Sequence, residues 1–308
     1  MTQKIFGHQN PDTDTVTSAL VAADIEKQLG NDVKAYRLGE VNGETAYALD
    51  YFSLEAPDLL NEVAAGDEVI LVDHNEKQQS AAGIENAVIT KVYDHHRIAN
   101  FETESPLYYR AEPVGCTATI LNKVYKEKNL TISKEAAGLM LSAIISDTLL
   151  FKSPTTTEED IDAASELKSV AGVDLETYGL EMLKAGASTA DKTARELITG
   201  DAKTFDIGEK SVRIAQVNVV DVDEVFARRE EIELAINEEI EKDGYDLFTL
   251  IVTDILNSNS KVLALGAEFS SIERAFDVVL DQNTAVLEGV VSRKKQVVPN
   301  ITKALSDL

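Results

Sequence analysis

The sequence has little of what several classes of protein require. It contains one cysteine, Cys116, among 308 residues. A single cysteine forms neither an internal disulfide nor a cysteine-based zinc site, so neither can stabilise the fold. No apolar run approaches the ~18 residues of a membrane span, and the segment MTQKIFGHQNPDTD does not have the pattern of a signal peptide. We therefore expect a cytoplasmic protein with no membrane partner.

Basic residues are also scarce. Lys and Arg number 29 against 54 Asp and Glu, which gives a formal net charge of −25 at pH 7. Both halves of the chain are acidic, and this charge disfavours a broad interface with nucleic acid or with an anionic membrane. A chain of this kind would bind phosphate only locally, through metal ions or through a few concentrated basic residues.

An alternation of strand and helix patterns predicts an α/β fold for the first part of the chain. Short apolar runs, typical of buried parallel strands, lie at 4–8, 32–38, 67–73, 87–94 and 107–112. Stretches with helical patterns lie at 13–29, 115–129, 133–149, 157–170 and 174–184. We expect a doubly wound, mainly parallel sheet, with Ser133 capping one helix.

A small, polar segment at 185–192 predicts a linker to a second domain. Beyond it, the pattern predicts a hairpin around Gly208 and one long charged helix from about Val222 to Lys242. Further strands are predicted at 246–255, 261–267 and 285–291. We expect a first domain at 1–187, a linker at 188–194 and a smaller α/β domain at 195–308, across a cleft from the first.

All four histidines follow predicted strands and lie among acidic residues. The three clusters are His8-Gln-Asn-Pro-Asp12-Thr-Asp14, Asp73-His74-Asn75-Glu76 and Asp94-His95-His96-Arg97. In an open α/β sheet, ligands bind beyond the carboxyl ends of the strands, so these clusters should meet at one edge. Several carboxylates held together repel one another, and divalent cations relieve that repulsion.

The number of candidate ligands favours two metal ions over one. The candidates are His8, Asp12, Asp14, Asp73 and His95, with Asp147 as a sixth. Asp147 lies near the end of an apolar helix, where a metal ligand and an exposed carboxylate are equally plausible. Oxygen ligands with a few imidazoles suit Mn²⁺, Fe²⁺ or Co²⁺ better than Mg²⁺. Two ions about 3.5–4 Å apart are typical of enzymes that hydrolyse phosphate bonds.

The basic cluster Ser292-Arg293-Lys294-Lys295-Gln296 stands out in so acidic a chain. By itself, such a cluster is more typical of a solvated charge run than of a binding site. The alternative is a phosphate clamp, in which the fork of Arg293 binds oxygens and the lysines supply positive charge. Lys203 carries no signal of its own.

Seven segments together resemble the family II inorganic pyrophosphatases of the DHH phosphoesterase superfamily. In chain order they are GHQNPDTD, VDHNE, DHHR, EPVGCTATI, SDT, DAKTF and SRKKQ. A bare DHH is a weak signal, but the full set in this order is specific and spans essentially the whole chain. The resemblance implies a DHH domain, a DHHA2-type domain and the hydrolysis of pyrophosphate to two orthophosphates by a hydroxide that two metal ions activate.

The resemblance also implies roles for individual residues. His8 and Asp12 would bind one Mn²⁺, and Asp73 would bridge it to a second Mn²⁺. The other ligands of the second ion would be Asp14, His95 and Asp147. The groups implied to bind pyrophosphate are His96, Lys203, Arg293 and Lys294, with Asn75 as a further contact. Catalysis would use His96, Asp73, Lys203, Arg293 and Lys294.

Further expectations concern supporting residues, ions and assembly. His74 and Asp94 would orient their neighbours through hydrogen bonds. Co²⁺ would substitute for Mn²⁺, Mg²⁺ would accompany the substrate, and the chain would form a homodimer.

Two other functions remain open on sequence grounds. The first is a related DHH phosphoesterase that acts on short polyphosphates or on nucleotides. Nucleotide-cleaving members usually end in a GGGH-type motif, and no histidine follows His96, which counts against nucleotides. The second is a non-catalytic metal-binding regulator, although the complete set of candidate ligands counts against it.

Overall fold

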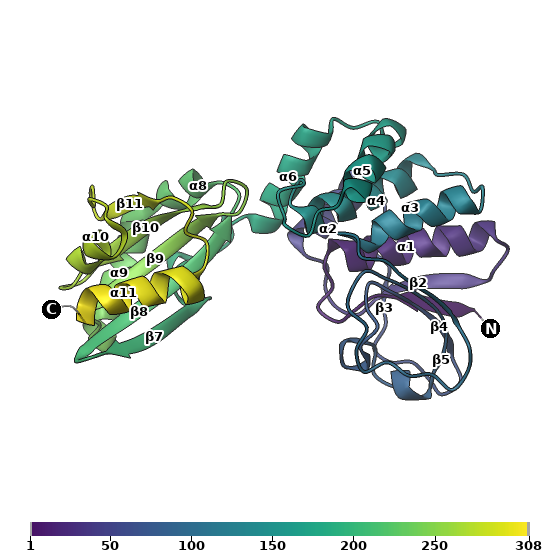
Figure 1. Ribbon diagram of the computed structural model, residues 1–308, viewed down its shortest axis with the longest axis horizontal. Coiled ribbons are helices and arrows are strands. Elements are labelled where there is room, and N and C mark those ends of the chain that lie inside the picture. The colour runs from purple at the N-terminus through teal and green to yellow at the C-terminus, as the bar shows by residue number, and fades with distance from the viewer. Residues whose placement is uncertain (1, 307–308) are drawn as a thin grey trace. The chain divides into compact units, whose positions relative to one another are not determined.

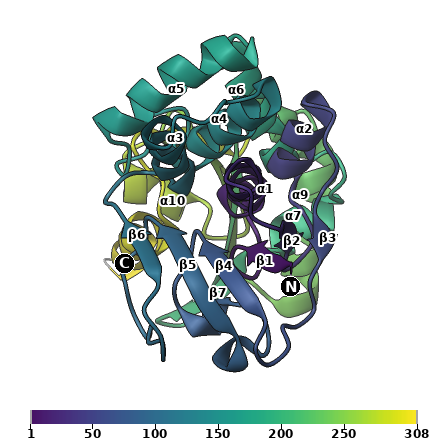
Figure 2. The same cartoon turned by 90° about the vertical axis from the view of Figure 1, so that its right-hand side faces the viewer.

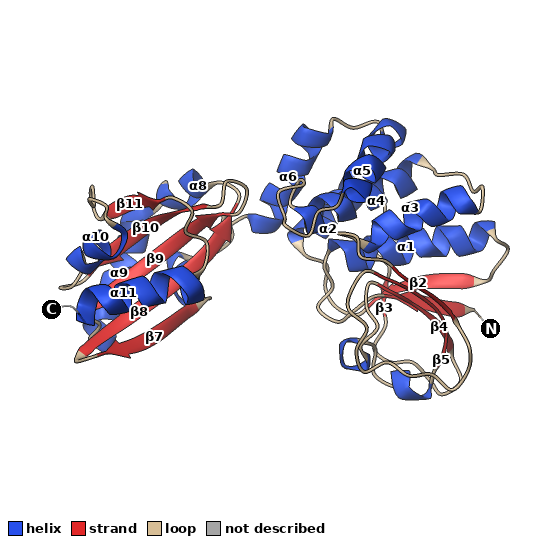
Figure 3. Cartoon of the chain, in the orientation of Figure 1, coloured by secondary structure: helices blue, strands red, loops and turns tan. Residues whose placement is uncertain are grey.

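The computed structural model describes residues 2–306, and the chain divides into two compact units, Met1–Gly186 and Ala187–Leu308. Figure 3 shows the helices and strands of each unit. The first unit contains β1 (Gln3–Phe6), α1 (Thr13–Gln28), β2 (Val33–Arg37), α2 (Gly43–Tyr51), β3 (Asp58–Leu59), β4 (Glu68–Val72), the short 3-10 helices η1 (Lys77–Gln79) and η2 (Ile84–Asn86), β5 (Val88–Asp94), β6 (Tyr108–Ala111), α3 (Thr117–Glu127), α4 (Lys134–Thr148), α5 (Glu158–Ala171) and α6 (Leu175–Ala187).

The sheet of the first unit has the strand order β3-β2-β1-β4-β5-β6, and every neighbouring pair is parallel. The apolar run of β4 explains its central place, because four of its five residues are buried. Val69 and Leu71 pack with Phe6 on one face of the sheet. The prediction of a mainly parallel α/β sheet is confirmed.

Helices cover the other face of this sheet in layers (Figures 1 and 2). α1 and α3 pack against the strands, α4 packs on α1, and α5 packs on α4. Ser133 caps α4 as predicted, since its side chain accepts a hydrogen bond from the backbone N–H of Ala136. β1, β4 and β5 lie side by side and parallel, so the segments that follow them start from one edge of the sheet.

The second unit is a mixed sheet between helices. Its elements are α7 (Ala194–Thr199), β7 (Ala202–Ile207), β8 (Lys210–Val219), α8 (Val222–Phe226), α9 (Arg229–Asp243), β9 (Leu247–Asp254), β10 (Asn259–Leu265), α10 (Ser270–Phe276), β11 (Thr284–Leu287), the π-helical turn η3 (Arg293–Val297) and α11 (Val298–Ser306). The strand order is β11-β10-β9-β8-β7, with β8 and β9 parallel and the other pairs antiparallel. The predicted smaller α/β domain and the hairpin at Gly208 are therefore confirmed.

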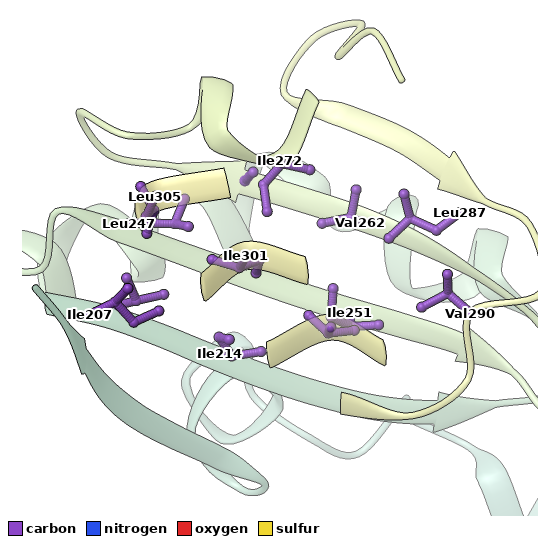
Figure 4. Packing of buried hydrophobic residues seen from close by; sticks show 13 residues of the cluster. Ile207, Ile214, Leu247, Ile251, Val262, Ile272, Leu287, Val290, Ile301 and Leu305 are labelled. Atoms are coloured by element: carbon purple, nitrogen blue, oxygen red, sulfur yellow. The ribbon is translucent and has the colours of Figure 1, made fainter. Parts of the chain in front are cut away.

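Apolar side chains fill both faces of this second sheet. Ile301 of α11 lies over Ile214 and Ile251 of the strands (Figure 4). On the other face, Ile232 and Ile236 of α9 are buried in a separate cluster. Each such side chain contributes roughly 1.5–3 kcal/mol when it is fully buried, so both faces stabilise the unit.

The prediction of one helix from Val222 to Lys242 is wrong. The chain forms α8 and α9, and Arg228 between them has a non-helical backbone with φ −103° and ψ 19°. Its guanidinium donates hydrogen bonds to the carbonyl oxygens of Lys192 (2.7 Å) and Thr189 (3.3 Å). These distant partners favour the break, and a helical periodicity read along the chain does not detect them. Within residues 2–306, no helix is both long enough and apolar enough to cross a bilayer.

Candidate metal centre

Three neighbouring strands deliver the central side chains of the site. His8 follows β1, Asp73 follows β4 and His95 follows β5. The Nε2 atom of His8 lies 3.5 Å from Oδ2 of Asp73, and the Nε2 atom of His95 lies 3.4 Å from Oδ1 of Asp73. One carboxylate therefore faces an imidazole with each of its two oxygens.

The first donor group consists of His8, Asp12 and Asp73, whose donor atoms lie within 4.8 Å of one another. Asp12 is the N-cap of α1, and its Oδ1 accepts a hydrogen bond from the backbone N–H of Thr15. This bond leaves Oδ2 of Asp12 facing His8, 3.4 Å from Nε2. The cap thus fixes the first turn of α1 and directs one oxygen into the site.

The second donor group starts from the other oxygen of Asp73, and Asp73 shares a cluster with His95 and His96. Oδ2 of Asp147 lies 3.8 Å from Nε2 of His95. Asp147 also shares a cluster with Asp14 and the thiol of Cys116, within the same 4.8 Å limit. Both Asp14 and Asp73 are almost completely buried. The structure thus brings together all six predicted metal ligands in one unit.

The geometry of these donors fits divalent cations. Donor atoms about 2.0–2.2 Å from one ion lie about 2.8–3.6 Å apart at octahedral or tetrahedral angles, which matches most of the distances above. The Nδ1 atom of His8 lies 2.7 Å from the carbonyl oxygen of Gln9, and the Nδ1 atom of His95 lies 3.0 Å from the carbonyl oxygen of Val114. When Nδ1–H donates to the carbonyl, the Nε2 lone pair of each neutral ring is free to bind an ion.

Threonine hydroxyls orient the bridging carboxylate. Asp73 accepts hydrogen bonds from Thr15 Oγ1 (2.7 Å) and from Thr117 Oγ1 (3.0 Å), one on each oxygen. Its backbone adopts φ +59°, which is unusual for a residue with a side chain. This conformation at the end of β4 is sterically unfavourable, and such strain is concentrated at functional sites.

The charges of the site favour cations strongly. Burial and the nearby charge of Asp73 raise the pKa of Asp14 to about 7, and burial with the neighbouring carboxylates raises the pKa of Asp147 well above its ordinary value. Burial lowers the pKa of His8, but Asp12 and Asp73 outweigh that effect and raise it to about 11. Protons thus balance these carboxylates when no cation is bound. A divalent ion would displace those protons.

A second set of contacts holds His96 at the rim of the site. Oδ1 of Asp94 accepts hydrogen bonds from the backbone N–H (3.0 Å) and from Nδ1 (2.9 Å) of His96. Oδ2 of Asp94 accepts from Nδ2 of Asn75 at 2.6 Å. The hydrogen bond to Asp94 raises the pKa of His96 above its ordinary value, although burial opposes it. The imidazole of His96 remains half exposed.

Asn75 and His74 are buried and bonded to the protein. The Asn75 amide also donates to the carbonyl of Arg97 and accepts from the backbone N–H of Ala99, which ties the loop after β5 to β4. His74 bonds to Val72 O at 2.9 Å and to Ser80 Oγ at 3.0 Å. Burial lowers the pKa of His74 to about 4, so its ring is neutral near pH 7.

The basic candidates belong to the second unit. Lys203 is an exposed residue of β7. Arg293 begins η3 and donates hydrogen bonds from its guanidinium to the carbonyl oxygen (2.6 Å) and the carboxylate (2.7 Å) of Asp201, two residues before Lys203. Lys294 lies in η3, and its side chain is outside the described part of the structure. Through Asp201, the first residue of η3 lies next to the start of β7.

The sequence did not predict the contacts that several other residues make in the site. Thr117 donates its backbone N–H to Asp14 Oδ2 at 2.6 Å in addition to its bond with Asp73. Oε2 of Glu44 accepts from Ser146 Oγ at 2.5 Å and from Thr13 Oγ1 at 3.4 Å, which links α4 to α1. Burial raises the pKa of Glu44. Thr117 lies within a recognised motif, but its partners are distant in sequence.

Comparisons with known proteins cover nearly the whole chain. A family model described as the DHH family N-terminal domain matches residues 4–144, and a DHHA2 domain model matches residues 180–304. A Staphylococcus epidermidis protein named probable manganese-dependent inorganic pyrophosphatase is 63% identical over 303 residues, which cover 98% of each chain. The manganese-dependent inorganic pyrophosphatase of Bacillus subtilis is 60% identical over 305 residues, again 98% of each chain.

Solved structures show the same relationship. A Methanococcus jannaschii crystal structure, assigned to the family II inorganic pyrophosphatases, has a TM-score of 0.62 and 41% identity and covers 99% of this chain and 100% of its own. A Bacteroides fragilis exopolyphosphatase-related protein, with 15% identity and a TM-score of 0.51, covers 99% of this chain and 92% of its own and shows the fold alone. By its sequence and its two domains, the chain belongs to the family of manganese-dependent inorganic pyrophosphatases, the family II enzymes of the DHH superfamily.

Proposed function

We propose that the chain hydrolyses inorganic pyrophosphate to two orthophosphates. The observation that carries the proposal is the Asp73 carboxylate, which faces one donor group with Oδ2 and another with Oδ1. Relatives that are 60–63% identical over 98% of the chain are named for this activity. Two divalent ions, when bound, would lower the pKa of a water molecule and neutralise charge on the phosphoryl oxygens.

Each donor group would hold one ion. His8 and Asp12 would serve the first ion, and Asp73 would serve both. The remaining ligands, all for the second ion, are Asp14, His95 and Asp147. The mixture of imidazole and carboxylate supports Mn²⁺, with Co²⁺ as a substitute, and Mg²⁺ would enter with the substrate.

The substrate would meet positive charge from the second unit. Arg293 would bind phosphoryl oxygens through its planar fork, with Lys203 and Lys294 supplying further charge. The negative charge of two phosphoryl groups would otherwise repel the carboxylates of the first unit. On this proposal the chain consists of a metal-binding domain at 1–187, a linker at 188–194 and a substrate-binding domain at 195–308.

His96 would bind the leaving phosphate and donate a proton to it, and Asn75 would add a further contact with the substrate. The contact with Asp94 supports this role, because a carboxylate that raises the pKa of His96 keeps the ring protonated to higher pH. We also propose that the protein is a cytoplasmic homodimer. Its net charge of −25 disfavours nucleic acid or an anionic membrane as a partner.

Asp94→Asn should move the pH dependence of turnover. Loss of the carboxylate lowers the pKa of His96, so the imidazole loses its proton at a lower pH and the alkaline limb of the kcat profile shifts to lower pH. We expect kcat at pH 8 to fall about ten-fold or more. Glu76→Gln is the matched control, because Glu76 lies in the neighbouring loop and pairs with Arg97 instead. An unchanged alkaline limb in Asp94→Asn would refute the proton-donor role.

The proposed function is tested by phosphate release from chelator-stripped protein, before and after addition of Mn²⁺. Pyrophosphate, tripolyphosphate and a dinucleotide are compared under the same conditions. We expect rapid, Mn²⁺-dependent release from pyrophosphate and little from the other two. Activity mainly on tripolyphosphate or on the dinucleotide would assign the site to another phosphoesterase function. Bound metal without any activity would favour a regulator.

A further inference from the structure

Asp160 is a fully buried carboxylate near the start of α5 that touches none of the proposed metal ligands. Its two oxygens accept four hydrogen bonds. The donors are Gly115 N (2.8 Å), Thr119 Oγ1 (2.6 Å), Thr157 N (2.8 Å) and Thr157 Oγ1 (2.7 Å). Burying a carboxylate is costly unless its oxygens are bonded in this way, and two of these bonds reach the turn that precedes α3 and its first residues.

That turn, at residues 114–117, contacts three proposed metal ligands. The carbonyl oxygen of Val114 lies 3.0 Å from Nδ1 of His95. The backbone N–H of Thr117 donates to Asp14 Oδ2 at 2.6 Å. The hydroxyl of Thr117 donates to Asp73 Oδ1 at 3.0 Å. One short segment therefore orients an imidazole and two carboxylates.

The fit between Asp160 and the turn is close. A Cβ atom at position 115 would lie 2.6 Å from Oδ2 of Asp160 and 3.2 Å from Cγ2 of Thr148, so only glycine fits there without a shift. Gly115 lies directly after Val114 and two residues before Thr117. A displacement of the Gly115–Asp160 contact is therefore transmitted to both residues that hold the ligands.

We infer that Asp160 is a positioning residue for the second metal-binding group. It fixes the turn 114–117 and, through it, the orientation of Asp14, Asp73 and His95. The inference rests on the proposed function only for the assignment of these three residues as ligands. Residues that orient metal ligands typically change metal affinity or activity by about 10–100-fold when they are replaced.

The test compares Asp160→Asn with Thr157→Ala in full-length protein stripped of metal. The amide of Asp160→Asn keeps the shape of the side chain but replaces one accepting oxygen with an NH₂ group. Either the N–H of Gly115, which bonds to Oδ2, or the hydroxyl of Thr119, which bonds to Oδ1, then loses its acceptor. Thr157→Ala removes the N-cap hydroxyl of the same helix, which lowers its stability, and leaves the bonds from Gly115 and Thr119 intact. The two variants thus separate helix capping from support of the turn.

Mn²⁺ affinity is measured by calorimetric titration, and thermal unfolding is measured without metal. We expect Asp160→Asn to weaken Mn²⁺ binding at least ten-fold, and the Mn²⁺ affinity of Thr157→Ala to stay within about two-fold of the parent. Both variants should unfold at a lower temperature than the parent. Equal Mn²⁺ affinity in the two variants would overturn the inference, because Asp160 would then only stabilise the fold.

A milder variant covers the case in which Asp160→Asn does not fold. Thr119→Val removes one donor to Oδ1 of Asp160 and leaves the other three. We expect Mn²⁺ binding to weaken about three-fold or more, and an unchanged affinity would refute the positioning role. The readout is metal affinity and does not depend on catalysis. If the parent chain binds Mn²⁺ but does not cleave pyrophosphate, the proposed function is refuted, and the Mn²⁺ affinities of the variants still test the role of Asp160.

Discussion

Asp73→Asn is expected to lower turnover on pyrophosphate about a thousand-fold or more. The two oxygens of Asp73 face the imidazoles of His8 and His95, so Asp73→Asn loses one ligand atom and the negative charge that attracts both ions. A metal ion contributes several kcal/mol to catalysis, and about 4 kcal/mol corresponds to a thousand-fold change in rate. The measurements are kcat in excess Mn²⁺ and the number of Mn²⁺ ions bound per chain.

Asp67→Asn is the matched control for this change. Asp67 lies at the other end of β4, where it pairs with Lys4 and accepts a hydrogen bond from the backbone N–H of Ala64. Its replacement removes the same charge at the opposite end of β4 and should leave kcat within about two-fold, because surface ion pairs contribute little. If Asp73→Asn kept two Mn²⁺ ions and most of the activity, the bridging role would be wrong.

Arg293→Ala is expected to lower kcat/KM about a hundred-fold or more while Mn²⁺ affinity stays within two-fold. Arg293 is in the second unit, and all the proposed ligands are in the first, so only substrate binding and catalysis should change. A hundred-fold loss is about 2.7 kcal/mol, which one or two hydrogen bonds from a charged group can supply. The measurements are steady-state kinetics and Mn²⁺ titration of the same preparation.

Two further variants sharpen this prediction. Arg293→Lys keeps the charge but loses the planar fork, so it should recover only part of the activity. Lys295→Ala removes an exposed charge from the same turn and should have little effect. A collapse of Mn²⁺ affinity in Arg293→Ala would contradict the division of roles between the two units.

Much of the fold was predictable because it depends on local patterns. The runs that became β4 and β5 are rich in Val and Ile, and such runs are readable without knowledge of their partners. The break between α8 and α9 was not predictable, because Arg228 is held by the carbonyl oxygens of Thr189 and Lys192, more than thirty residues earlier. Tertiary contacts of this kind override a periodic pattern.

The candidate site divides in the same way. His8, Asp73 and His95 follow strands that are recognisable in the sequence. Because the carboxyl ends of parallel strands lie at one edge of a sheet, these three residues were predicted to meet. The groups that orient them come from elsewhere in the sequence, since Thr117 is 103 residues from Asp14 and Asp160 is 45 residues from Gly115. A short sequence motif does not reveal contacts between residues so far apart in the chain, so these contacts are identified only from the structure.

The most direct test of the central claim is electron paramagnetic resonance of the chain titrated with Mn²⁺. If the Asp73 carboxylate joins two ions, the protein should bind two Mn²⁺ per chain and give the signal of a spin-coupled pair at saturation. Asp73→Asn should lose that coupling. A single Mn²⁺ per chain, or two ions that give only uncoupled signals, would contradict the account of a shared carboxylate between two metal sites.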